Sequence, residues 1–208
     1  GRPKGVAHTH RVHVTMIMTE MADWDWPRDI RFLALTPITH ASGAMIMPVL
    51  LKSGTYAMTQ GFTPEKFIRL VEQHRITATF LVPTMVYVLL DSPARQGADL
   101  SSLQLIIYGA SPMSPARLTE GIRELGPVFM QLYAQSEAPN TVTVLHQHEH
   151  DPVHHPERLA SCGTPCVGTQ VRLLDDDGRE VPRGDVGEIC VRGPLVMQGY
   201  WNKPEETA

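Results

Sequence analysis

The stretch LIIYGASPMSPARLTEGIRELGPVFMQLYAQSE, residues 105–137, alternates apolar and polar segments in an order that decides the fold. An apolar run at 105–108 ends at Gly109, a helical pattern covers about 115–125, and a second apolar run at 128–133 ends in the polar pair Ser136–Glu137. This order predicts strand, loop, helix, strand and loop. If the two strands are parallel, both loops lie at the carboxyl edge of the sheet, where open α/β sheets bind ligands.

The residues before this stretch repeat the same alternation. Short apolar strands are expected at 31–35, 55–58 and 77–82, and helices at about 8–23, 45–51 and 84–90. Thr63, Pro64 and Glu65 are typical of a helix start, because they supply an N-cap, a first-turn proline and an acidic first turn. The pattern predicts an α/β fold with a mostly parallel sheet flanked by helices over residues 1–160.

The pattern changes to all-β after Thr169. Turn residues at Asp175–Gly178 and Pro182–Asp185 separate alternating segments at 170–174 and 187–193, which are hairpin signals. We therefore expect a small β-rich, distorted barrel-like subdomain over residues 161–208. The aspartate run lacks the spacing of a calcium-binding loop and is interpreted as a turn.

Composition narrows the class of ligand. The 208 residues carry a formal net charge of −4 and three cysteines, and Lys and Arg are scattered. This argues against a nucleic-acid surface and favours a small-molecule ligand in a cytoplasmic protein. The apolar runs fall short of the ~18 residues of a membrane span. The sequence begins with GRPKG rather than with a Met, and it ends at Pro-Glu-Glu, residues typical of a helix start. We therefore expect it to be a piece of a longer chain.

Two polar stretches are ambiguous on their own. The loop around Gly1, Lys4 and Gly5 precedes a helix and could hold a phosphate, but such loops are more often plain turns. The histidine-dense stretch from His146 to His155 could capture a metal ion, and a solvated loop is the favoured alternative.

Six separated stretches together resemble the adenylate-forming enzymes, a superfamily that includes acyl-CoA synthetases, luciferases and peptide-synthetase adenylation domains. They occur in the order of that superfamily across essentially the whole chain. The six are GRPKGV at 1–6, PITHASG at 37–43, YGASPMS at 108–114, YAQSE at 133–137, GEICVRG at 187–193 and GYWNKPEET at 199–207.

The resemblance implies an ATP-dependent reaction in two steps. A carboxylate attacks the α-phosphorus of ATP to give an acyl-adenylate and pyrophosphate, and a thiol, usually that of coenzyme A, then takes the acyl group. The implied substrate is a fatty or aromatic carboxylic acid, and Mg²⁺ is the implied metal. Such chemistry depends on charge neutralisation and positioning more than on a covalent nucleophile.

The resemblance also assigns roles to individual residues. Catalytic roles at the phosphates fall to Lys4, Ser136 and Glu137, with Glu137 as the Mg²⁺ ligand. The implied nucleotide-binding residues are Gly1, Gly5, Gly109, Ala110, Ser111, Tyr133 and Ala134, with Tyr133 stacking on adenine. His40 and Gly43 are placed on the carboxylate side. From the residues alone, the favoured interpretations are plainer: Tyr133 as half-buried core, Ser136 as a turn hydroxyl, Glu137 as a solvated charge and His40 as a helix N-terminal residue.

The chain departs from the superfamily pattern in two ways. Ala134 and Ser136 replace the usual Gly and Thr of the Tyr-Gly-x-Thr-Glu loop, although serine keeps the hydroxyl. The Ser/Thr-rich half of the phosphate loop, a ribose-binding Asp and a C-terminal adenylation Lys have no counterpart in the 208 residues, so we expect this chain alone not to adenylate a carboxylate. Alternatives to coenzyme A ligation are the loading of a carrier protein and a non-catalytic nucleotide-binding module.

Overall fold

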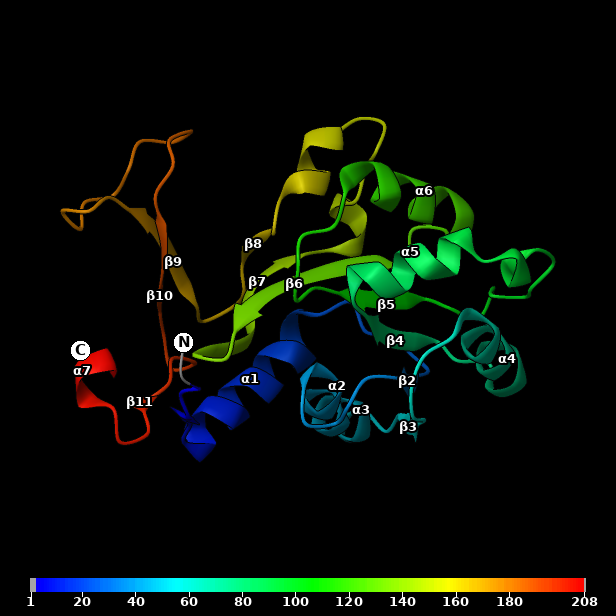
Figure 1. The fold of residues 1–208 in the computed structure, drawn as a ribbon, viewed down its shortest axis with the longest axis horizontal. Helices are drawn as coiled ribbons and strands as arrows, with labels where there is room; N and C mark the ends of the chain where they lie inside the picture. Colours follow the sequence, from blue (N-terminus) through cyan, green and yellow to red (C-terminus); the bar gives the residue numbers. More distant parts are fainter. Residues whose placement is uncertain (1–2, 208) are drawn as a thin grey trace.

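The computed structural model describes residues 3–207, and a seven-stranded sheet forms its centre. The strand order is β3-β2-β4-β5-β6-β7-β8 (Figure 1). The first five strands in this order are parallel, and β7 and β8 are antiparallel to their neighbours. The strands of this sheet are β2 (Arg31–Ala34), β3 (Thr55–Met58), β4 (Ala78–Leu81), β5 (Leu105–Tyr108), β6 (Phe129–Gln135), β7 (Ala138–Leu145) and β8 (Thr164–Pro165).

Helices cover both faces of the sheet, as expected for a parallel sheet whose strands are buried on both sides (Figure 1). The helices α4, α5 and α6 lie on one face and α1, α2 and α3 on the other. Their bounds are α1 (His10–Asp23), α2 (Ala41–Ala44), α3 (Ile46–Leu51), α4 (Pro64–His74), α5 (Pro83–Asp91) and α6 (Pro115–Leu125). The shorter 3₁₀ turns are η1 (Pro93–Arg95), η2 (Gln147–Glu149) and η3 (Pro156–Ala160).

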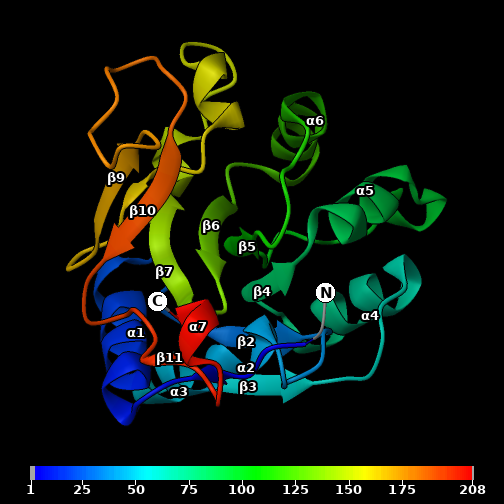
Figure 2. The same cartoon turned by 60° about the vertical axis from the view of Figure 1, so that its left-hand side comes forward.

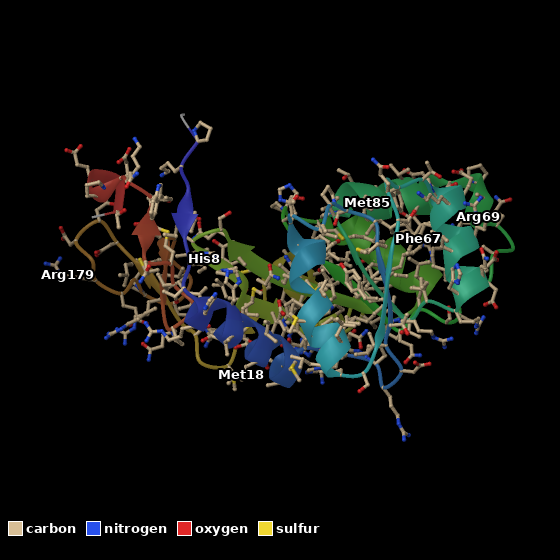
Figure 3. The ribbon with its side chains drawn as sticks, turned by 90° about the horizontal axis from the view of Figure 1, so that it is seen from below. His8, Met18, Phe67, Arg69, Met85 and Arg179 are labelled. Atoms are coloured by element: carbon tan, nitrogen blue, oxygen red, sulfur yellow. The ribbon has the colours of Figure 1, made fainter. Side chains whose placement is uncertain are left out.

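Two core clusters arise from the alternation of side chains along the central strands. On β5, Ile106 and Tyr108 pack with Phe67 of α4, whereas Leu105 and Ile107 pack with Val49 of α3. Figure 3 shows Phe67 within the side chains of the molecule, with Arg69 on the outer side of the same helix. All four residues of β5 are buried, which is why this strand reads as a continuous apolar run.

The helix start predicted from the capping residue Thr63 is confirmed, and a second cap, not predicted, is found at Thr9. Thr63 accepts a hydrogen bond from the backbone N–H of Lys66, and α4 begins at Pro64. Thr9 caps α1 in the same way through Val12, so this helix begins at His10. The helix expected at 45–51 is found at Ile46–Leu51 and is preceded by a separate turn of helix, α2, with Met45 as the capping residue between them.

Small antiparallel pairs complete the structure, in line with the β-rich pattern of the last quarter. β9 (Gln170–Leu174) pairs with β10 (Glu188–Arg192), and β1 (Val6–Ala7) pairs with β11 (Gly199–Tyr200). Figure 2 shows the end of the chain, with β11 and α7 (Pro204–Thr207), returning to the region where the chain begins. The last sequence motif therefore lies beside the first one.

A domain boundary at 160/161 stays a prediction. No helix in residues 3–207 has the length and apolar character needed to cross a membrane.

The hairpin β6–β7 was not foreseen. The last strand expected in the α/β pattern ends at Tyr133, whereas Ala138–Leu145 forms the longest strand of the sheet and pairs antiparallel with β6. Ser136 and Glu137 therefore form the tight turn between two strands. The turn holds both side chains at the edge of the sheet.

Candidate functional site

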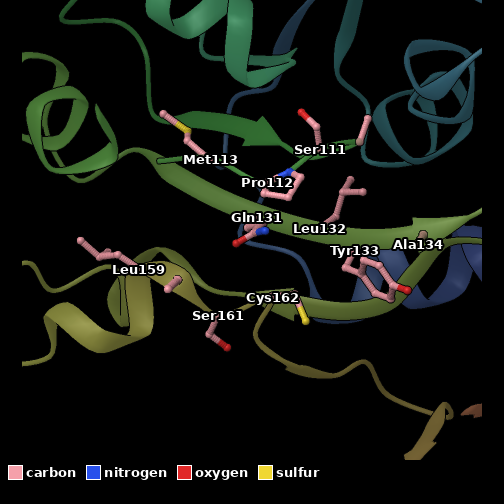
Figure 4. Close-up of a pocket in the computed structure, with 12 residues that line it drawn as sticks. Ser111, Pro112, Met113, Gln131, Leu132, Tyr133, Ala134, Leu159, Ser161 and Cys162 are labelled. Carbon is pink, nitrogen blue, oxygen red and sulfur yellow. The ribbon is translucent and has the colours of Figure 1, made fainter. Parts of the chain in front are cut away.

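Two adjoining cavities lie where β5 and β6 end. The smaller one has a volume of about 290 Å³ and is formed by the loop after β5, the middle of β6 and the segment after η3 (Figure 4). Its lining residues are Ala110, Ser111, Pro112, Met113, Gln131, Leu132, Tyr133, Ala134, Leu159, Ala160, Ser161 and Cys162. The position at the carboxyl end of parallel strands is the one expected for a ligand site in an α/β sheet.

The larger cavity, of about 790 Å³, shares Ala110, Leu132 and Ala134 with the smaller one. It extends from there toward α1 and the segment before α2. Its lining is mostly apolar. The residues that line the larger cavity but not the smaller one include His8, Met16, His40, Gly43, Phe80, Val82, Ser136, Pro139 and Asn140. The two cavities together can hold a ligand with two chemically different ends.

The loop after β5 needs small residues for steric reasons. A Cβ atom on Gly109 would lie 2.6 Å from the backbone oxygen of Leu132 on β6, which is closer than real Cβ contacts. The next residue, Ala110, has a positive φ of 66°, a conformation that is uncommon for residues other than glycine. This turn brings Ser111, Pro112 and Met113 into the wall of the smaller cavity.

Tyr133 and Ala134 reach the cavity wall through an irregularity in the β6–β7 ladder. The register shifts between the pairs Tyr133–Thr143 and Gln135–Ala138, so that Ala134 alone stands opposite residues 139–142 and the extra residues lie on β7. Ala134 does not belong to the residues with positive φ in the described part of the chain. Alanine therefore fits this loop where glycine would have been the more permissive residue.

Glu137 lies in a cluster of charged and polar groups that combines the first and last motifs of the sequence. The Tyr200 hydroxyl donates a hydrogen bond to Oε1 of Glu137, and Nζ of Lys4 lies 3.9 Å from the centroid of the Tyr200 ring. The hydrogen bond from Tyr200 holds the pKa of Glu137 below its usual range, and the positive charge of Lys4 acts in the same direction. Glu137 is thus an ionised carboxylate near the ammonium group of Lys4.

Ser136 adjoins this cluster from the turn between β6 and β7. Its backbone oxygen lies 2.8 Å from Nε2 of His8, which ties the turn to the segment that leads into α1. Figure 3 shows His8 near the start of that helix. Ser136 also lines the larger cavity. The structure thus places Lys4, Ser136 and Glu137 in one region, although they come from opposite parts of the chain.

The two residues expected on the carboxylate side line the larger cavity, as does Ser136. His40 is exposed and precedes α2 as its N-cap residue, without a side-chain capping bond. Gly43 is required by close approach, since a Cβ there would lie 1.8 Å from the backbone oxygen of Ile38.

The glycines of the first motif remain untested. Gly1 lies outside the described residues. Gly5 is exposed, and its backbone oxygen accepts a hydrogen bond from the N–H of Trp201. A Cβ on Gly5 would meet its nearest neighbour at 3.5 Å, so neither strain nor crowding demands glycine there. Its role at a phosphate stays a prediction.

The histidine-dense stretch is not simply a solvated loop, which corrects that interpretation for two of its members. Nδ1 of His146 lies 3.2 Å from Oδ1 of Asp25, and His150 is buried against Tyr108. Among residues 3–207, no group of three or more His, Cys, Asp or Glu side chains is arranged to hold a metal ion. These histidines take part in long-range contacts that sequence spacing does not reveal.

Sequence reasoning missed several residues of the site. Gln131 lines the smaller cavity, and a signal was present, because a polar residue interrupts an otherwise apolar strand at FMQLY. Asn140 lines the larger cavity with φ of 55° and donates a hydrogen bond to the buried Glu20. Tyr200 lay within a recognised motif, but its contact with Glu137 spans 63 residues.

The geometry supports definite chemical tasks. Tyr133 supplies an aromatic face beside a cavity with small side chains at Ala110, Ser111 and Ala134, which suits a planar base. Lys4 and the Ser136–Glu137 turn supply a cation, a hydroxyl and a carboxylate next to it, which suits phosphates and a hard divalent cation. The larger, mostly apolar cavity is open to a hydrophobic group.

Comparison with known proteins agrees with this arrangement. A family model described as AMP-binding enzyme matches residues 1–201. The chain is 48% identical to the medium/long-chain-fatty-acid–CoA ligase FadD8 of Mycobacterium tuberculosis, covering all of this chain and 36% of that protein. It is 40% identical to feruloyl-CoA synthase of an Amycolatopsis species, covering all of this chain and 42% of that protein.

The fold is similar to that of the amide bond synthetase McbA from Marinactinospora thermotolerans, with a TM-score of 0.91 and 34% sequence identity. The match covers all of this chain and 42% of the synthetase. The chain thus spans about two fifths of the length of the proteins it matches.

Proposed function

Because the chain belongs to the AMP-binding enzyme family, we propose that it supplies the nucleotide-binding part of an ATP-dependent acid–thiol ligase. The observation that carries the proposal is the meeting of Lys4, Ser136 and Glu137 beside a cavity walled by Tyr133 and Ser111. A base site and a phosphate site next to each other are what ATP requires.

The proposal gives the smaller cavity to adenine. Tyr133 stacks on the ring, while Gly109, Ala110 and Ser111 let the base approach the backbone closely. The phosphates then extend toward the turn at Ser136. There the hydroxyl of Ser136 contacts the α-phosphate, and Lys4 contacts the departing phosphates.

The proposal places Mg²⁺ at Glu137, whose lowered pKa keeps it ionised at neutral pH. Ionised carboxylates are the protein ligands that Mg²⁺ prefers. When bound, the metal ion would neutralise charge on the polyphosphate. The hydroxyl of Tyr200, which donates a hydrogen bond to Oε1 of Glu137, orients that carboxylate.

The carboxylic acid occupies the larger cavity, with its carboxylate near His40 and Gly43 and its apolar part against residues such as Met16 and Phe80. A carboxylate oxygen attacks the α-phosphorus, the bond to the bridging oxygen breaks, and pyrophosphate leaves. In the second step the sulfur of coenzyme A attacks the acyl carbon, loses its proton, and displaces AMP. The chain's own residues contribute binding, alignment and charge stabilisation.

The apolar lining of the larger cavity favours a fatty or aromatic acid. The two named relatives act on a fatty acid and on an aromatic acid of the feruloyl type, and both are named for coenzyme A products. The acceptor is less constrained, because another relative, 32% identical over the whole of this chain, is named a fatty acid–[acyl-carrier-protein] ligase. Loading of a carrier protein is therefore the alternative second step.

The test is ATP–pyrophosphate exchange with a panel of fatty and aromatic acids, using the full-length protein that contains this chain. We expect acid-dependent exchange that is lost in Glu137→Ala. Absence of exchange, together with ATP binding, would favour the non-catalytic nucleotide-binding module instead. We also expect the 208 residues by themselves to show no exchange above their own Glu137→Ala variant.

A further inference from the structure

Three side chains connect a buried histidine to the wall of the smaller cavity. The hydroxyl of Tyr108 lies 3.0 Å from Nε2 of His150 and 3.3 Å from the amide oxygen Oε1 of Gln131. Tyr108 is fully buried and His150 is 5% exposed, whereas Gln131 lines the cavity. Figure 4 shows Gln131 between the loop that carries Pro112 and the segment that carries Ser161.

The tautomer of His150 is set by its other ring nitrogen. Nδ1 lies 2.7 Å from the backbone oxygen of His146, which can only accept a hydrogen bond. Nδ1 must therefore carry a proton. In a neutral ring, Nε2 then has no proton and can only accept.

Burial favours the neutral ring. It lowers the pKa of His150 and outweighs the opposing effects of the His146 carbonyl, Glu149 and Asp25. Burial likewise raises the pKa of Tyr108, which keeps its proton at neutral pH. The Tyr108 hydroxyl can donate one hydrogen bond, and the unprotonated Nε2 of His150 accepts it.

The oxygen of Tyr108 is then left as an acceptor toward Gln131. The oxygen and nitrogen of a glutamine amide have nearly the same shape, so their placement follows from the hydrogen-bond network. Because the Tyr108 oxygen can only accept once its proton is bonded to His150, the two amide atoms of Gln131 exchange places, and the NH₂ group takes the position of Oε1 beside Tyr108. The amide oxygen is consequently turned toward the cavity.

We propose that His150 and Tyr108 are positioning residues that fix the side-chain amide of Gln131 with its oxygen facing the smaller cavity, so that the site selects a purine bearing an exocyclic amine. The inference rests on the proposed function, which places the base in this cavity. An amide oxygen accepts a hydrogen bond from the 6-amino group of adenine, but it opposes the 6-oxo group of hypoxanthine. His150 and Tyr108 thus produce a preference for ATP over ITP through Gln131, without contacting the base themselves.

The experiment compares the affinities for ATP and ITP, each with Mg²⁺, by isothermal titration of the wild-type protein and its variants. We expect the wild type to prefer ATP by about tenfold, or about 1.4 kcal/mol. Tyr108→Phe should reduce that ratio to near one while ATP still binds, because the amide loses the neighbour that orients it. Tyr56→Phe, which also removes a hydroxyl that donates to a backbone oxygen, should leave the ratio unchanged.

Variants of His150 separate positioning from a merely structural role. His150→Phe should lower the ratio as Tyr108→Phe does, and the double variant should lower it no further. His150→Gln, which restores an acceptor, should recover most of the preference. A ratio that stays near tenfold in Tyr108→Phe, or additive effects in the double variant, would overturn the inference while leaving the proposed function intact.

A second measurement is independent of the ligand. Nitrogen-15 NMR of the His150 ring should show Nδ1 protonated and Nε2 unprotonated at neutral pH. The opposite tautomer, or an imidazolium, would overturn the inference whatever the nucleotide affinities. If the wild type binds neither ATP nor ITP, the proposed function fails, and the inference that rests on it fails too.

Discussion

Glu20 gives the sharpest prediction about the stability of the fold. Its side chain is fully buried on α1, where it follows Val12 and Met16 on the same buried stripe. Oε1 accepts a hydrogen bond of 3.0 Å from Nδ2 of Asn140, and Oε2 has no hydrogen-bond partner among the described residues. Burial raises the pKa of Glu20 from 4.5 to about 8, and the hydrogen bond from Asn140 offsets only part of that rise.

The consequence is a loss of stability with rising pH. Since the folded-state pKa lies above the unfolded-state value, the stabilising effect is fully present below about pH 4.5 and disappears as the pH rises through about 8. Each unit of difference between the two pKa values corresponds to about 1.4 kcal/mol, so full ionisation of Glu20 costs on the order of 5 kcal/mol. That is a large part of the ~5–15 kcal/mol of a typical domain.

The perturbation is Glu20→Gln, which keeps the shape and the acceptor for Asn140 but cannot ionise. Urea unfolding followed by tryptophan fluorescence at several pH values between 5 and 9 measures the free energy of unfolding of both proteins. We expect them to agree within about 1 kcal/mol at pH 5 and the variant to be more stable by several kcal/mol at pH 9. Glu205→Gln, at an exposed glutamate, is the matched control and should follow the wild type. Parallel pH profiles for wild type and Glu20→Gln would refute the reasoning.

Two further predictions concern the walls of the smaller cavity. Gly109→Ala should lower the free energy of unfolding by about 1–3 kcal/mol in the same urea assay, because its Cβ would lie 2.6 Å from the backbone oxygen of Leu132. The control is Gly5→Ala, whose Cβ would lie 3.5 Å from its nearest neighbour and which should change the free energy of unfolding by less than about 0.5 kcal/mol. Equal losses in the two variants would contradict the crowding argument. Tyr133→Ala should weaken ATP binding in isothermal titration by about tenfold or more through loss of stacking, while Tyr133→Phe should bind nearly as the wild type; loss of binding in both would show that the hydroxyl rather than the ring matters.

The central sheet could be predicted from sequence because its signals are local. The strand at Leu105–Tyr108 is apolar throughout and buried on both faces. Thr63 and Pro64 are residues typical of a helix start, and α4 begins there. The order of such elements then limits the topology to a parallel sheet with right-handed crossovers. Gly109 and Gly43 were picked out by the resemblance for a ligand, whereas their close approaches to the backbone oxygens of Leu132 and Ile38 are visible only in the structure.

Other features depend on contacts that no local pattern encodes. The strand β7 was missed because Pro139 and Asn140, both turn-forming residues, stand near its start and conceal the β-branched run that follows. His150 resembled a solvated loop residue, and only the fold brings it to Tyr108, which lies 42 residues earlier. The pairing of Glu137 with Tyr200 likewise exists only once β11 has returned to β1.

The central claim is that the two polar loops at the ends of β5 and β6 bind one ATP molecule. A crystal structure of the protein with ATP and Mg²⁺ tests it most directly. The account predicts the purine in the smaller cavity against Tyr133 and Ser111, with the phosphates and the metal ion extending toward Lys4, Ser136 and Glu137. A nucleotide bound away from both loops, or one with its phosphates in the smaller cavity, would contradict it.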